Sequence, residues 1–313
     1  MKSAPAAVTT GSWVGEREKG SSLSLRAARW IALTLGRRVT RGLQAVGVAW
    51  VVLTNAGLRR HSRRYLNRAL GRPAHWRDVW RHVFTFTNVI LDRIYLLQQR
   101  FDAFTFEAKG IETILEPFGN GVGVLAFGAH VGSFEALRMI GHDKGLRVAM
   151  IMYEDNARLL NQTLAAIAPD AGLHTITLGR VDAMLSLRRW LDEGGVAGLL
   201  ADRTLPGQSQ RSKTVLLPFL GSPAPFSDGP FRLAAMLRRK VVFMAGLYRG
   251  GTHYDLRFAE LADFGTLGTA SGAERDVAIR AALECYVATL ESLCREAPYN
   301  WFNFYDFWAE EAP

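Results

Sequence analysis

The sequence lacks several features that would assign a chemistry directly. It contains only two cysteines, Cys285 and Cys294, whose spacing fits neither a CxxC redox motif nor a zinc pattern. It also lacks a glycine fingerprint for dinucleotides, a P-loop, an HExxH sequence and a Gly-x-Ser-x-Gly sequence. The histidines other than His130 show no ligand-like spacing, so we expect no metal site. Residues 1–20 have no apolar core, and a secretory signal peptide is therefore not expected.

Acidic residues are scarce in the N-terminal third of the chain. Between Arg26 and Arg100 there are fifteen arginines, no lysine and two acidic residues, Asp78 and Asp92. Residues 101–313 instead carry more acidic than basic side chains, although the whole chain has a net charge of +9. The basic excess therefore lies in the N-terminal third, which indicates an anionic partner for that region.

Long apolar runs are also missing, with one partial exception at residues 42–58, which carry no charge. At about 1.5 Å per residue, a helix of this length reaches about 26 Å, short of a hydrocarbon core of about 30 Å. Arginines flank the run on both sides, whereas a spanning helix usually has its positive excess on one side. We therefore expect a monotopic helix or helix pair in the membrane interface, with arginines at anionic headgroups. A single spanning helix and a buried helix of a soluble core are the alternatives.

From residue 101 onwards the pattern changes to alternating strands and helices. Strands are expected at 104–108, 122–127, 146–152, 173–178, 195–201, 241–248 and 254–258, and helices from 134 and at 156–167, 181–192, 229–239 and 274–295. This alternation favours an α/β fold with a mainly parallel central sheet and helices on both faces. We expect an N-terminal helical, membrane-associating region at 1–100, with a helix break near residues 71–73, and an α/β domain at 101–313.

One strand–turn–helix segment carries the candidate chemistry. The strand at 122–127 is followed by a glycine-rich turn with His130, and Ser133 is suited to cap the next helix. If Glu135 lies in the first helical turn, its carboxylate can reach back to the imidazole, fix its tautomer and leave the other ring nitrogen as a general base. Backbone N–H groups near Gly132 and Ser133 are expected to hold an oxyanion at the helix N-terminus.

Further candidates follow other strands on the same side of the expected sheet. Asp202 can orient the acceptor or a neighbouring group, and Arg203 can hold a phosphate or an oxyanion; a structural loop contact is the alternative for both. Asn156 and Arg158 are candidates for binding a headgroup, and helix capping is the alternative for Asn156. Residues 299–308 are too aromatic for an exposed tail and are expected to pack on the sheet end or to line an acyl pocket.

These residues resemble the motifs of a known family. The segment Gly128-Ala-His-Val-Gly-Ser-Phe-Glu135 is similar to the His-(four residues)-Glu motif of the bacterial lipid A late acyltransferases, a branch of the lysophospholipid acyltransferase superfamily. In that family the histidine and the acidic residue form the catalytic dyad, and they match His130 and Glu135. Blocks at 153–158, 201–203 and 219–234 follow in the family's order, so the resemblance covers residues 101–313.

The resemblance implies an O-acyltransferase at the cytoplasmic face of the bacterial inner membrane, with no cofactor. The expected donor is an acyl thioester of acyl carrier protein or coenzyme A, and the expected acceptor is a hydroxyl of a lipid or glycolipid. Membrane lipids are the expected partners and nucleic acid is not. Two alternatives stay open: a basic nucleic-acid-binding module on an α/β domain, and a catalytically inactive membrane scaffold with this fold.

Overall fold

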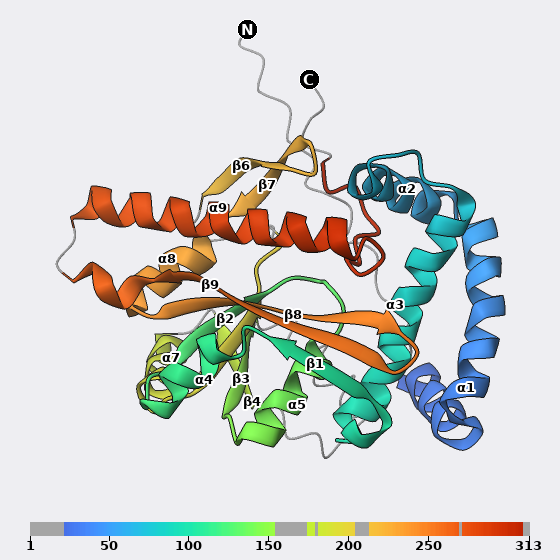
Figure 1. The fold of residues 1–313 in the computed structure, drawn as a ribbon, viewed down its shortest axis with the longest axis horizontal. Coiled ribbons are helices and arrows are strands. Elements are labelled where there is room, and N and C mark those ends of the chain that lie inside the picture. The colour runs from blue at the N-terminus through green and yellow to red at the C-terminus, as the bar shows by residue number, and fades with distance from the viewer. Residues whose placement is uncertain (1–21, 154–173, 179–180, 204–212, 269–270, 309–313) are drawn as a thin grey trace, which may run out of the picture.

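The computed structural model describes residues 22–153, 174–178, 181–203, 213–268 and 271–308 (Figure 1). Three helices open the described chain, namely α1 (Ser22–Thr54), α2 (Ala56–Leu70) and α3 (Trp76–Leu97). After a short 3-10 turn, Phe101–Ala103, the elements are β1 (Thr105–Lys109), α4 (Glu112–Gly119), β2 (Val124–Gly128), α5 (Phe134–Lys144), β3 (Val148–Tyr153), β4 (His174–Leu178), α7 (Val181–Asp192), β5 (Val196–Leu200), β6 (Thr214–Phe219), β7 (Ser222–Ser227), α8 (Gly229–Leu237), β8 (Lys240–Gly250), β9 (His253–Asp263), the 3-10 turn Phe264–Leu267 and α9 (Gly272–Glu296).

Seven strands form the central sheet in the order β1-β9-β8-β2-β5-β3-β4. The strands from β8 to β4 run parallel to one another, whereas β9 is antiparallel to β8 and β1 is parallel to β9. Figure 1 shows α8 and α9 on one side of this sheet and α4 and α5 on the other. The predicted α/β fold with a mainly parallel, doubly covered sheet is therefore confirmed.

Strand β2 lies in the middle of the sheet and belongs to both halves of the core. Leu125 and Phe127 point into the cluster that includes α8 and α9, while Val124 and Ala126 point into the cluster that includes α3 and α5. Every residue of the strand is buried, as expected where helices cover both faces of a parallel sheet. The end of β2 is therefore a rigid base for the turn that follows it.

Most predicted elements are present, with ends shifted by a few residues as is usual for such boundaries. The helix predicted at 156–167 lies outside the described residues. Helix α4 and the antiparallel pair β6–β7 were not predicted. Pro218, Pro223 and Pro225 lie in that pair, and proline is typical of edges rather than central strands. The pair forms a separate two-stranded sheet, where these prolines are tolerated.

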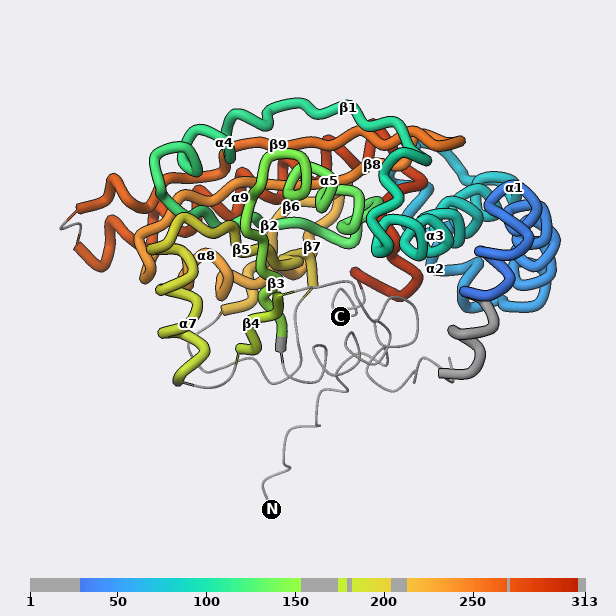
Figure 2. The backbone as a smooth tube through the Cα atoms, turned by 90° about the horizontal axis from the view of Figure 1, so that it is seen from below, coloured from blue at the N-terminus to red at the C-terminus, as the bar shows by residue number. Residues whose placement is uncertain are grey.

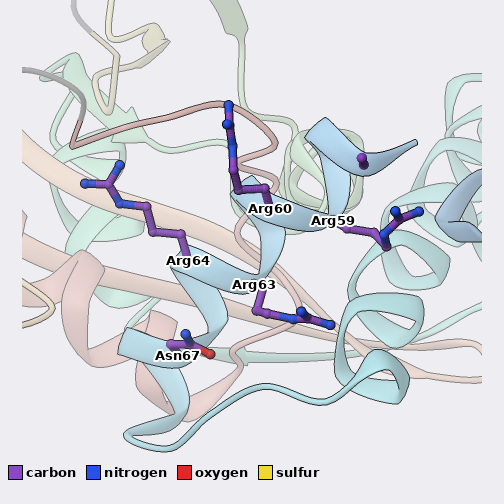
Figure 3. A pocket seen from close by; sticks show the side chains of 6 residues that line it. Arg59, Arg60, Arg63, Arg64 and Asn67 are labelled. Carbon is purple, nitrogen blue, oxygen red and sulfur yellow. The ribbon is translucent and has the colours of Figure 1, made fainter. Parts of the chain in front are cut away.

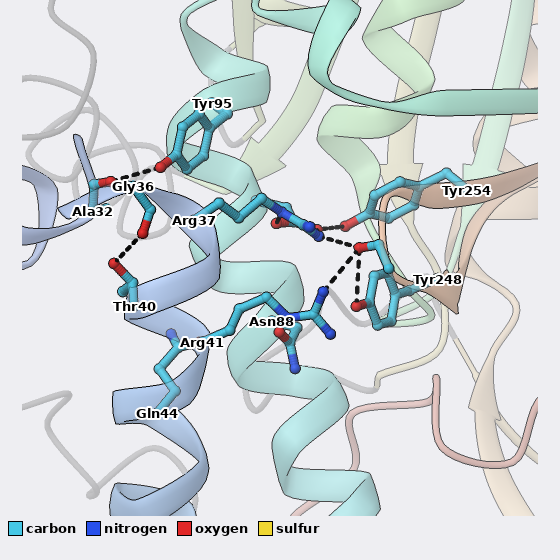
Figure 4. A network of polar contacts seen from close by, with 12 residues as sticks. Ala32, Gly36, Arg37, Thr40, Arg41, Gln44, Asn88, Tyr95, Tyr248 and Tyr254 are labelled. Atoms are coloured by element: carbon cyan, nitrogen blue, oxygen red, sulfur yellow. Dashed lines mark hydrogen bonds and ion pairs between the residues drawn. The ribbon is translucent and has the colours of Figure 1, made fainter. Parts of the chain in front are cut away.

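The N-terminal helices gather at one end of the molecule beside the sheet (Figure 2). Helix α1 bends at Gly36, which has a φ of 75°, and then packs along α3. Arg37 of α1 pairs with the buried Asp92 of α3 (Nη2–Oδ2 2.7 Å), and the hydroxyl of Tyr254 donates to the same carboxylate at 2.8 Å. Figure 4 shows Arg37 reaching from α1 towards Tyr254 and Tyr248 of the sheet. This network fixes α1 to the α/β core.

A single spanning helix is one of the alternatives for residues 42–58. Among the described residues, none of the helices combines the length and the apolar content that crossing a bilayer requires.

Candidate active site

The site is built where two neighbouring parallel strands end. Strands β2 and β5 are paired so that Gly128 lies opposite Leu200, and the N–H of Ala201 donates to the carbonyl of Gly128 at 2.9 Å. His130 lies two residues beyond the end of β2, and Asp202 lies two residues beyond the end of β5. The strand register therefore brings these two side chains together at the carboxyl edge of the sheet, where ligands bind in open α/β folds.

The imidazole of His130 is held by the carboxylate of Asp202. Nδ1 of the ring lies 2.8 Å from Oδ1, and the backbone N–H of His130 donates to Oδ2 at 3.0 Å. Asp202 is fully buried, whereas the side chain of His130 is 32% exposed. The Nδ1 edge of the ring is thus held by Asp202, while part of the side chain remains exposed.

The electrostatics of Asp202 determine the tautomer of His130. Burial alone would raise the pKa of Asp202, but the charge and hydrogen bond of His130, the charge of Arg203 and the indole N–H of Trp301 hold that pKa well below its ordinary value. The carboxylate stays ionised and accepts the proton on Nδ1, which leaves the lone pair on Nε2. Within the described part of the chain, Nε2 has no hydrogen-bond partner, so it is available as a base.

Glu135 does not make the contact with His130 that the sequence spacing predicted. It is in the first turn of α5, as expected, but its carboxylate pairs with Arg93 of α3 (Nε–Oε1 2.7 Å) and accepts from the hydroxyl of Ser133 at 3.3 Å. Among the described residues, no hydrogen bond joins Glu135 to the imidazole. The first turn of α5 faces α3, where the guanidinium of Arg93 attracts the carboxylate of Glu135. The expected contact between Glu135 and His130 is therefore not made.

The predicted oxyanion donors are also engaged. The N–H of Gly132 donates to the carbonyl of Asn300, and the N–H of Ser133 donates to the carbonyl of Gly246, both at 2.8 Å. Gly132 has a φ of +63°, and a Cβ there would lie 2.0 Å from the oxygen of Gly246. The expectation that these two amides point at a reactant is wrong, because they join the turn to β8 and to the C-terminal segment. Ser133 does cap α5, accepting from Ala136 at 3.1 Å.

Arg203 lies beside the dyad formed by His130 and Asp202. Its guanidinium donates to the carbonyl of Phe302 at 3.3 Å and lies 5.3 Å from the ring centre of Tyr305. Arg203 therefore lies beside the dyad and contacts the C-terminal segment, and its expected role with a phosphate or an oxyanion stays a prediction. Asn156 and Arg158 lie outside the described residues.

A comparison with known families identifies the family of the chain. The sequence model of one family, described as bacterial lipid A biosynthesis acyltransferase, matches residues 27–308. The chain belongs to this family. The family is one of acyltransferases, which agrees with the resemblance predicted from the motifs. A search of curated proteins finds no match.

The sequence of this lipid A acyltransferase family member did not reveal the residues that complete the site. Asn300, Trp301 and Phe302 lie far along the chain, yet Val131 pairs with Trp301 in an isolated β-bridge and Phe302 donates its N–H to the carbonyl of His130 at 2.8 Å. The indole N–H of Trp301 donates to Oδ2 of Asp202 at 3.0 Å. The aromatic content of this segment was the available signal. It predicted packing on the sheet end or the lining of an acyl pocket, and it did not indicate these hydrogen bonds.

Proposed function

We propose that the protein is a membrane-associated O-acyltransferase that moves a fatty acyl group from an acyl thioester to a hydroxyl of a lipid or glycolipid. The observation that carries the proposal is the pairing of His130 with an ionised, buried Asp202 in a member of an acyltransferase family. The acyl thioester is one of acyl carrier protein or of coenzyme A. No cofactor is required, because the donor already contains an activated acyl group.

The proposed reaction uses Nε2 of His130 as the general base. Nε2 takes the proton of the acceptor hydroxyl, and the oxygen attacks the thioester carbonyl. The tetrahedral intermediate then collapses, the C–S bond breaks, and the thiolate receives the proton from the imidazolium. Asp202 stabilises the imidazolium in between, and Arg203, which lies beside the dyad, can stabilise the oxyanion. The products are the acylated lipid and the free thiol.

We assign Glu135 a supporting role in this reaction. Its contacts with Arg93 and Ser133 tie the N-terminus of α5 to α3, directly after the turn that bears His130. Its place in the motif is then explained by the position of the turn rather than by a contact with the imidazole.

Three variants test the catalytic assignment in a thioester turnover assay with purified protein. His130→Ala and Asp202→Asn should each lower kcat by about 100-fold or more, the usual range for loss of general base catalysis. Glu135→Gln should retain far more activity than Asp202→Asn when both are equally folded by circular dichroism. Full activity in His130→Ala would refute the mechanism, and equal losses in the Glu135 and Asp202 variants would restore Glu135 as a catalytic residue.

We propose that α1 and α2 form the membrane-facing surface, at the cytoplasmic face of the bacterial inner membrane. Large apolar side chains recur at three- and four-residue steps along the outer face of α1, including Val46, Trp50 and Leu53, which are 73%, 67% and 76% exposed. An exposed apolar stripe of this kind is typical of a helix that lies in the interface. Membrane binding through this stripe does not require a helix that crosses the bilayer.

A cluster of arginines continues this surface on α2. Arg59, Arg60, Arg63 and Arg64 fan out from the helix around a hollow of about 350 Å³ (Figure 3). Arg64 pairs with Asp306, whereas Arg60 and Arg63 have no acidic partner among the described residues. Like charges at this spacing repel one another, so an anionic surface would stabilise the cluster.

Vesicle flotation tests the membrane proposal. Arg60→Gln with Arg63→Gln, and separately Trp50→Ser, should lower binding to vesicles of anionic phospholipid, and salt should weaken the first contribution only. Arg280→Gln, an exposed arginine of α9 that pairs with Glu284, is the control and should bind as wild type does. Salt-sensitive DNA binding without vesicle binding would instead favour the nucleic-acid alternative.

A further inference from the structure

The C-terminal segment holds the backbone of the His130 turn from one side. The carbonyl of Asn300 accepts the N–H of Gly132, and the N–H of Phe302 donates to the carbonyl of His130, both at 2.8 Å. The side chain of Asn300 is in turn bound to both backbone groups of Tyr248, at 2.7 and 3.1 Å. The segment is therefore anchored to β8 before it crosses the turn.

Between these two backbone contacts, the side chain of Trp301 reaches the carboxylate of Asp202. Oδ2 of Asp202 accepts two hydrogen bonds, from the indole N–H of Trp301 and from the backbone N–H of His130, both at 3.0 Å. Oδ1 faces Nδ1 of the imidazole. With Oδ2 held by two donors, the carboxylate plane cannot turn without losing both of them.

We propose that Trp301 is a positioning residue of the acyltransferase site, whose indole N–H fixes the orientation in which Asp202 binds the imidazole of His130. The inference rests on the proposed function of His130 as the general base. Trp301 does not contact the reacting atoms, and it acts through Asp202.

Two hydrogen bonds in series also link the backbone of Trp301 to helices α2 and α3. Nε2 of His82 on α3 donates to the carbonyl of Trp301 at 2.8 Å, and Nδ1 accepts from the hydroxyl of Ser62 on α2 at 2.8 Å. All three residues are fully or almost fully buried. Satisfied polar networks in a core cost little and specify one arrangement of the groups that they join. The hydrogen bonds from Ser62 through His82 thus fix the position of the Trp301 backbone at the end of the sheet.

The protein contains a matched control for Trp301. Trp308 is equally buried, at 1%, and packs in the same aromatic cluster, with its ring centre 6.2 Å from that of Trp301. Its indole nitrogen is buried and has no hydrogen-bond partner among the described residues. A change from tryptophan to phenylalanine therefore removes the same atoms at both positions, but a hydrogen bond at only one of them.

The experiment compares Trp301→Phe with Trp308→Phe in the steady-state kinetics of acyl transfer. Loss of a hydrogen bond to a charged group corresponds to about a 10-fold effect or more. We expect Trp301→Phe to lower kcat by about 10-fold while the KM for the acyl donor stays near the wild-type value. We expect Trp308→Phe to keep the wild-type kcat, although both variants lose thermal stability. Equal kcat values in the two variants would overturn the proposal.

The pH profile of kcat/KM separates positioning from packing. Without the indole donor, Oδ2 of Asp202 keeps the backbone N–H of His130 as a donor but loses that of Trp301. The carboxylate then attracts the imidazolium more strongly, so the acidic limb should move to higher pH in Trp301→Phe and stay in place in Trp308→Phe. Among the described residues that interact with Asp202, burial raises the pKa values of Tyr286, Cys294 and Tyr305 well above their ordinary values, so these three groups do not titrate in this range.

A double mutant separates failure of this inference from failure of the proposed function. In the Asp202→Asn background, Trp301→Phe should cost little further activity, because the group that it positions is already impaired. Fully additive losses would refute positioning through Asp202 while leaving His130 as the base. Unchanged turnover in His130→Ala would instead refute the proposed function.

Discussion

The buried histidine behind the active site makes a defined prediction about acid stability. His82 is completely buried between α2, α3 and the C-terminal segment. Burial lowers the pKa of its imidazole from 6.5 to about 4, although the carbonyl of Trp301 acts in the opposite direction. At neutral pH the ring is neutral, with a proton on Nε2 for Trp301 and a lone pair on Nδ1 for Ser62.

The sign and size of the effect follow from this pKa difference. Below about pH 6.5 the unfolded chain binds a proton at His82 that the native protein does not bind until about pH 4. Acid therefore favours unfolding between these values, while the contribution of His82 to stability is complete above pH 6.5. The difference of roughly 2.5 pKa units corresponds to about 3 kcal/mol of unfolding free energy.

Urea unfolding at a series of pH values from 7 to 4 measures this contribution. His82→Gln is the comparison, because a glutamine amide can still donate to the carbonyl of Trp301 and does not titrate. The variant should be less stable at pH 7, but the stability difference should shrink by about 3 kcal/mol as the pH falls to 4. Buried carboxylates such as Asp202 contribute equally to both curves. Parallel curves for the two proteins would refute a neutral, buried His82.

Two further perturbations test the parts of the fold that hold the site. Asp92→Ala leaves the guanidinium of Arg37, a side chain that is 13% exposed, without its carboxylate, and should lower the free energy of unfolding by about 3–5 kcal/mol. Arg280→Ala breaks an exposed pair and should lower it by less than about 1 kcal/mol. Equal losses in the two variants would contradict the network in Figure 4. Gly132→Ala places a Cβ 2.0 Å from a carbonyl oxygen of β8 and should abolish turnover and lower the melting temperature sharply. Gly121→Ala, at a similar φ of +70° but with open space around it, should cost only about 1 kcal/mol, and similar melting temperatures would show that backbone strain, not the close approach, is decisive.

Several features were determined locally and could be predicted from the sequence. The apolar run before His130 forms β2, and the cap by Ser133 starts α5, because both depend on neighbouring residues. The alternation of strands and helices after residue 101 was sufficient to predict a mainly parallel sheet. The motif around His130, together with the blocks at 153–158, 201–203 and 219–234, predicted the acyltransferase family.

The partners of His130 were decided only by the tertiary structure. Sequence spacing favoured Glu135, but a carboxylate five residues away is placed by the direction of its helix, and α5 directs it to Arg93. Asp202 reaches the imidazole because β5, three strands later in the chain, inserts beside β2. No local pattern encodes which strands become neighbours.

What the sequence by itself determined is therefore the class of fold, the family and the histidine at the end of β2. The sequence also offered Asp202 as a candidate, but only the tertiary structure decided that Asp202 binds the imidazole and that Trp301 binds Asp202. The strand order and the path of the C-terminal segment depend on contacts between distant parts of the chain. A side chain's hydrogen-bond partner is set by where its strand or segment lies in space, and that position is a property of the whole packed core.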